Sequence, residues 1–180
     1  MNTSLQDQLR DKDEAISANP ELAFQEIWAA VKKEKLIGGQ PRSESSVRAL
    51  DFGQLALSIA GATAEPRWEA EASSIMAYVL NANESYADSL PYYERAIQML
   101  EASGREAQAA RIRLGYVYAM LMSGRAQDAI QIARVADEWF LRNGDEVEDR
   151  KFKRRRSSQP ITTFRINDWI VGGLRSIVAW

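Results

Sequence analysis

Small and large apolar residues recur along this chain at a spacing of forty residues. Two small positions lie seven residues apart in each of three copies; they are Ala49, Ser89 and Ala129, followed by Ala56, Ala96 and Ala136. Large residues coincide beside them: Leu50, Leu90 and Ile130, then Phe52, Tyr92 and Ile132. Because seven residues make two turns of one helix face, the pattern predicts helices whose small positions let a neighbouring helix approach closely.

A second apolar helix is predicted upstream of two of these copies. The segments "RWEAEASSIMAYVL" (67–80) and "AQAARIRLGYVYAML" (107–121) carry apolar stripes of helical period. They match each other at the same shift, in the pairs Ala70 and Ala110, Ala77 and Val117, and Tyr78 and Tyr118. The chain is therefore expected to be all-α, with a repeat domain over 1–150 built from helix–turn–helix units at about 20–60, 67–104 and 107–144.

Residues that start or stop helices agree with this division. Asn19 followed by Pro20 predicts a helix cap and first turn. Gly61 and Gly104 stand where a helix C-terminus favours a left-handed residue. Pro91 would break a helix that began at Tyr86, so Asp88 is predicted to be the cap of that helix.

The repeated segments resemble the tetratricopeptide repeat family. The resemblance rests on "LGYVY" (114–118), on "SGRAQDAI" (123–130) and on "YADSLPYYERAI" (86–97), and it covers roughly 45–145. A degenerate unit, "PELAFQEIWAAVKKEKLI", extends it toward the N-terminus. The spacing of forty exceeds the usual thirty-four and looks like the longer-helix variant of bacterial regulatory arrays. The resemblance implies a right-handed α-solenoid of stacked units, followed by a non-repeat C-terminal tail.

In that family the first helices of the units line a concave face that receives a peptide or a partner helix. The resemblance places these candidates there: Glu71, Ser74, Tyr78, Asn81, Arg111, Tyr118 and Met122. Tyr78 and Tyr118 suit an interface hot spot, although packing between helices explains them equally well. The family's carboxylate clamp pairs Lys with Asn one turn apart. The equivalent pairs here are Ser74 with Tyr78 and Leu114 with Tyr118, so no clamp is predicted.

Composition narrows the chemistry that the chain can perform. Among its 180 residues there is no Cys and no His, which excludes disulfides, thiol nucleophiles, imidazole bases and the usual zinc ligand sets. No phosphate-binding loop, dinucleotide fingerprint or HExxH pattern is present. We therefore expect no catalytic residue, no cofactor and no metal. The N-terminus lacks the apolar region of a signal peptide, and no run is long enough for a membrane span, so the expected location is cytoplasmic.

Charge is distributed unevenly, and the C-terminal thirty residues carry most of the positive excess. Residues 151–180 hold seven basic residues and one acid, whereas residues 1–150 hold sixteen basic residues and twenty-four acids. The basic run is Lys151, Lys153, Arg154, Arg155 and Arg156. Three interpretations stay open: a solvated helix end, a patch that binds nucleic acid through phosphates, or a segment that folds back on the acidic repeats.

The last twenty residues, 161–180, are again apolar. Asn167 is a candidate cap for a helix with a stripe of Trp169, Ile170, Leu174, Ile177 and Val178. This segment is expected to cover the open apolar end of the last repeat, with self-association as the other interpretation.

Taken together, these features predict a non-catalytic scaffold that binds a protein or peptide, or that serves as the sensing and interaction module of a larger regulatory system. The alternative is a nucleic-acid-associated regulator that uses the basic run. No membrane partner is expected.

Overall fold

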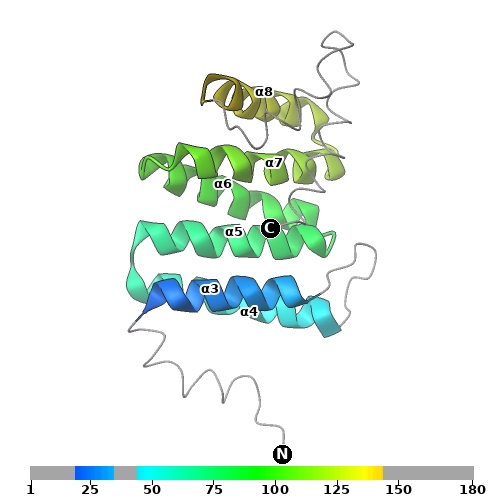
Figure 1. Cartoon of the computed structure of the whole chain (residues 1–180). Helices are drawn as coiled ribbons and strands as arrows, with labels where there is room; N and C mark the ends of the chain where they lie inside the picture. The colour runs from blue at the N-terminus through cyan, green and yellow to red at the C-terminus, as the bar shows by residue number, and fades with distance from the viewer. Residues whose placement is uncertain (1–18, 35–43, 144–180) are drawn as a thin grey trace, which may run out of the picture.

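The computed structural model describes residues 19–34 and 44–143, and these form six α-helices. The helices are α3 (Pro20–Lys33), α4 (Glu44–Thr63), α5 (Pro66–Ala82), α6 (Tyr86–Ala102), α7 (Glu106–Met122) and α8 (Ala126–Asn143). Each helix packs against the next one in the chain. Figure 1 shows them stacked from α3 and α4 at one end of the molecule to α8 at the other. The described part of the chain is therefore all-α, with sequential packing that is consistent with helical repeats.

The last four helices begin at intervals of twenty residues, at Pro66, Tyr86, Glu106 and Ala126. Two such intervals make up the period of forty that the sequence displays. The helices pair as three hairpins: α3 with α4, α5 with α6, and α7 with α8. The first hairpin departs from the interval of twenty residues, because α3 begins 46 residues before α5. The forty-residue register therefore runs through α4 to α8, and α3 lies outside it.

A left-handed residue ends each of the four helices α4 to α7, again every twenty residues. These residues are Ala64 (φ 52°), Glu84 (φ 62°), Gly104 (φ 71°) and Gly124 (φ 82°). In the last three turns the following N–H donates to the carbonyl five residues earlier, for example from Arg105 to Leu100 at 2.8 Å. This Schellman closure confirms the prediction for Gly104. The prediction for Gly61 was wrong, since it lies inside α4 and Ala64 takes the left-handed position.

The N-terminal ends of two helices test the predicted caps. The Asn19 side chain accepts a hydrogen bond from the N–H of Leu22 at 3.2 Å, and Pro20 occupies the first turn, as predicted. The assignment of Asp88 as a cap was wrong. Helix α6 begins at Tyr86 and keeps Pro91 in its second turn. Both Pro91 and Ala87, whose carbonyl the proline cannot bond, are exposed, so water can solvate that carbonyl.

The small positions of the sequence pattern lie at the most tightly packed points of the structure. All six are at most 1% exposed: Ala49, Ala56, Ser89, Ala96, Ala129 and Ala136. Because a Cβ is nearly all that these residues present, the second helix of each hairpin can lie close to its neighbours. The sequence prediction for these positions is confirmed.

Helix α5 is the most deeply buried of the six, because it joins two parts of the core. Ile75 and Val79 belong to the cluster that α3, α4 and α5 share, where Phe24 stacks on Trp68 with ring centroids 5.0 Å apart. Ala77 belongs instead to the cluster formed with α6, α7 and α8. The core therefore continues through α5 from one end of the stack toward the other.

The two interfaces between successive hairpins use large and small residues in opposite order. Between α4 and α5, a Cβ on Gly53 would lie 3.0 Å from the terminal methyl of Met76. Forty residues later, between α6 and α7, Tyr93 stands at the position of Gly53, and its ring covers Gly115. Gly115 in turn replaces Ile75, which is fully buried. Equivalent interfaces are thus filled by different pairs of side chains.

At the left-handed positions, replacing a glycine and introducing a glycine should change the free energy of unfolding in opposite directions. Gly104→Ala should lower the free energy of unfolding by about 1 kcal/mol, because an L side chain is disfavoured there. Glu84→Gly should raise it by up to about 1 kcal/mol for the same reason. Urea denaturation followed by circular dichroism checks both. Gly61→Ala, inside α4 with open space around its Cβ, is the control and should stabilise the protein. Equal signs for Gly104→Ala and Gly61→Ala would contradict this account.

The close contact between Tyr93 and Gly115 predicts an asymmetry between two glycine substitutions. In Gly115→Ala the new Cβ would lie 2.7 Å from the buried Tyr93 hydroxyl oxygen, and we expect a loss of about 1–3 kcal/mol of stability. Gly53→Ala should cost less, because it meets the flexible end of Met76. Thermal unfolding of the two variants compares them directly, and a smaller effect at Gly115 would refute the packing described.

Candidate partner-binding site

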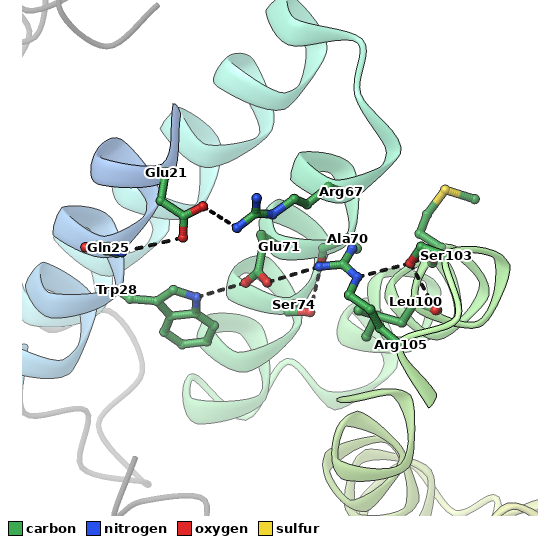
Figure 2. Close-up of polar contacts among 11 residues, drawn as sticks. Glu21, Gln25, Trp28, Arg67, Ala70, Glu71, Ser74, Leu100, Ser103 and Arg105 are labelled. Carbon is green, nitrogen blue, oxygen red and sulfur yellow. Dashed lines mark hydrogen bonds and ion pairs between the residues drawn. The ribbon is translucent and has the colours of Figure 1, made fainter. Parts of the chain in front are cut away.

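The first helices of the three hairpins lie in a row, and polar side chains tie them together. Helix α3 contacts α5, and α5 contacts α7. Glu21 of α3 forms an ion pair with Arg67 of α5, and it also accepts a hydrogen bond from Gln25 at 3.5 Å. Figure 2 shows these contacts on the surface that the two helices share. The N-terminal halves of α3 and α5 are therefore joined by an ion pair.

Glu71 stands at the centre of a second set of contacts. Its carboxylate accepts a hydrogen bond from Trp28 Nε1 of α3 at 3.5 Å, and its other oxygen lies 3.8 Å from Arg105 Nη1 (Figure 2). Arg105 is in the turn before α7, where its Nε donates to Ser103 Oγ at 3.0 Å. Its Nη2 is buried without a hydrogen-bond partner among the described residues. One carboxylate thus connects all three hairpins.

Aromatic side chains follow on the C-terminal halves of the same helices. Trp28 packs against Tyr78 of α5 with ring centroids 5.8 Å apart, and Lys32 Nζ lies 5.8 Å from the Trp28 ring. Tyr118 of α7 meets Tyr86 edge to face at 5.7 Å. Burial raises the pKa of Tyr78, and burial together with the Tyr118 hydroxyl raises the pKa of Tyr86 to about 12. Tyr78 and Tyr86 therefore remain protonated at neutral pH and act as neutral rings with a polar tip.

The four candidates on α5 divide into two groups. Glu71 and Tyr78 are partly exposed on the face that α5 turns toward α3. Ser74 is only 6% exposed, and its hydroxyl donates to the Ala70 carbonyl at 2.8 Å, so the helix itself uses that hydroxyl. Asn81 points toward α6, where its Nδ2 donates to Tyr93 Oη at 3.2 Å. Sequence spacing alone did not separate these two faces.

The three candidates on α7 lie together. Arg111, Tyr118 and Met122 are separated by seven and four residues, which places them within one narrow sector of the helix. Arg111 and Tyr118 are partly buried, whereas Met122 is 51% exposed. A methionine so exposed at a helix end offers an adaptable apolar contact.

Sequence reasoning missed three residues that the structure adds to this surface, namely Trp28, Tyr86 and Arg105. Trp28 was outside the forty-residue register because of the longer first hairpin. Aligning the prolines that begin α3 and α5, Pro20 and Pro66, would have found it, since that alignment places Trp28 opposite Ser74. Tyr86 and Arg105 stand at turns, where helical periodicity carries no signal.

Several of the sequence predictions fall outside the described residues. The basic run of Lys151, Lys153, Arg154, Arg155 and Arg156 lies there, as does the apolar segment 161–180. Within 19–34 and 44–143 no group of three acidic side chains is arranged to hold a metal ion. None of the helices in these ranges is long and apolar enough to cross a membrane.

No protein family matches the chain, and no curated protein or solved structure matches it either.

The hydrogen bond between Asn81 and Tyr93 predicts that a second substitution recovers the stability lost with the first. Asn81 Oδ1 is buried without a partner among the described residues, and Leu121 stands at the equivalent position of α7. Tyr93→Phe removes the remaining bond of the amide and should cost about 1–2 kcal/mol. Adding Asn81→Leu should recover that loss, because both polar groups are then gone. Denaturant titration of the single and double variants measures the coupling; additive losses would contradict it.

Proposed function

We propose that this chain is a non-catalytic interaction module that binds a peptide or a helix of another protein along its first helices. In this proposal the three hairpins form a right-handed solenoid of tetratricopeptide type, and α3, α5 and α7 line its concave face. The function proposed is to hold a partner within a regulatory assembly. No step of it requires a nucleophile, a metal or a cofactor.

The packing of the helices supports a concave face on this side. The first helices contact one another, from α3 to α5 and from α5 to α7. The second helices, α4 with α6 and α6 with α8, approach each other marginally at most. A stack whose first helices are closer together than its second helices curves toward the first ones.

The single observation that carries the proposal is the row of partly exposed apolar side chains on this face. Trp28 on α3, Tyr78 on α5, and Tyr118 and Met122 on α7 are each at least partly exposed, and the rings of Trp28 and Tyr78 pack together. Aromatic residues and methionine are enriched at protein interfaces, and rings that are already packed lose little conformational entropy on binding. The charged groups beside them, such as Glu71, are already paired. The surface therefore suits a partner that presents apolar anchors.

Selection from a displayed peptide library against the full chain tests the proposal. A labelled peptide selected in this way should lose at least about tenfold in affinity, measured by fluorescence polarisation, when Met122→Lys places a charge on the row. The methionine is exposed, so the variant should keep its thermal stability. Gln98→Lys adds the same charge to the outward side of α6 and is the matched control.

Equal loss of affinity in both variants, or in neither, would reject binding on this face. Failure to select any peptide, combined with a salt-dependent gel shift that Arg154→Ala, Arg155→Ala and Arg156→Ala together abolish, would replace the proposal with nucleic-acid binding.

A further inference from the structure

The last described helix, α8, has on one face a row of four residues, here called the stripe. The equivalent four residues of α6 pack against the next hairpin. On α6 this stripe consists of Leu90, Glu94, Ile97 and Glu101. Leu90 and Ile97 are buried in the core that includes α7. Glu94 accepts a hydrogen bond from the Tyr116 hydroxyl, and Glu101 forms an ion pair with Arg113. All four residues of the stripe therefore have their role in the contact between α6 and α7.

The equivalent stripe of α8 consists of Ile130, Arg134, Asp137 and Leu141, each forty residues later. Leu141 is 54% exposed, Ile130 is partly exposed, and Arg134 and Asp137 are exposed. Neither charged residue has an ion-pair partner within the described ranges. The stripe is built like an interface, but none of the described helices covers it.

The sequence that follows α8 does not continue the repeat. Residues equivalent to the buried Ala109, Ala110 and Tyr116 of α7 are Asp149, Arg150 and Arg156. A helix with these residues on its inner face would bury unpaired charges against α8, which is strongly unfavourable. Another hairpin of this chain is therefore not what the stripe of α8 fits.

From the N-terminal to the C-terminal end of α8, the four residues of the stripe are apolar, basic, acidic and apolar. Two copies of the stripe that lie antiparallel are therefore complementary in charge. When two copies of α8 lie antiparallel about a two-fold axis, Arg134 faces Asp137 of the second copy, and Ile130 faces Leu141. A two-fold interface requires this kind of self-complementarity. We propose that α8 is a homodimerisation surface and that its occupant is the same stripe of a second copy of this chain.

The apolar segment 161–180 fits the stripe less well. Its predicted stripe of Trp169, Ile170, Leu174, Ile177 and Val178 contains no charge. Covering α8 with it would remove water from Arg134 and Asp137 without supplying new partners, and burying charged groups in this way costs free energy. The second copy supplies a partner for both. This surface is also separate from the row on the first helices, so the inference stands independently of the proposed function.

The expected dimer is weak. Helix α8 has 18 residues, so it is roughly 27 Å long at 1.5 Å per residue. A pair of such helices buries an area at the small end of specific interfaces, for which we expect a dissociation constant of about a micromolar to tens of micromolar. Association should therefore depend on concentration in this range.

Charge reversal on the full chain tests the proposal. Arg134→Asp places acids at both central positions, and Asp137→Arg places bases at both. Each variant alone should be a monomer in sedimentation equilibrium at concentrations where the parent protein dimerises. An equimolar mixture of the two should form a heterodimer, because acids then face bases on both sides of the axis. Gln131→Glu, on the outward side of α8, is the control and should leave dimerisation unchanged.

Two outcomes overturn the proposal. A parent protein that stays monomeric up to about tenfold above the expected dissociation range would show that the second copy does not occupy the stripe. A dimer that both charge variants keep would place the interface elsewhere, and deletion of 157–180 would then show whether that segment forms it. Unchanged circular dichroism of the variants excludes unfolding as the cause of a loss.

Discussion

The stack depends on one steric constraint, which is that the second helix of each hairpin must lie close to its neighbours. Six alanine or serine side chains, at two positions in each of α4, α6 and α8, satisfy it, and all six are almost completely buried. A larger side chain there would push the helices apart and reduce the contacts of everything around it. Larger rings share the core with these small residues: Trp68 belongs to the same cluster as Ala49 and Ala56, and Tyr93 to the same cluster as Ala129.

Polar contacts across the first helices have a different role from the apolar core. Glu21 with Arg67, and Glu71 with both Trp28 and Arg105, lie at or near the surface, where such bonds add only modestly to stability. Their value is geometric, because each one fixes the position of one hairpin relative to the next. The aromatic side chains of Trp28 and Tyr78 lie beside these contacts and are held in place with them.

The sequence predicted the helices and their sequential packing well because its evidence came from buried positions. Ala49, Ala96 and Ala136 recur because only a small side chain fits where the helices pack closely, and this requirement is visible in the sequence as a repeated small residue. The candidate surface on the first helices was predicted less well. Periodicity placed Ser74 and Asn81 beside Tyr78, but a difference of about a quarter of a turn decides whether a side chain faces a groove or a neighbouring helix. Turn residues such as Arg105 leave no periodic trace at all. Pro91 was misjudged for the opposite reason. Proline disfavours the interior of a helix, but the packing of α6 as a whole outweighs this local preference.

The alternation of Gly53 against Met76 and of Tyr93 against Gly115 has a consequence for how such an array can change in length. Removing the hairpin of α5 and α6 would bring Gly53 opposite Gly115 and would replace the flexible Met76, which contacts Gly53, with the rigid ring of Tyr116. Duplicating that hairpin would bring Tyr93 opposite Ile75, and two bulky groups would compete for one space. The side chains at each junction fit only the hairpin that they contact, so they fix the order of the hairpins. Adding or removing a whole hairpin would therefore require compensating substitutions at the new junction.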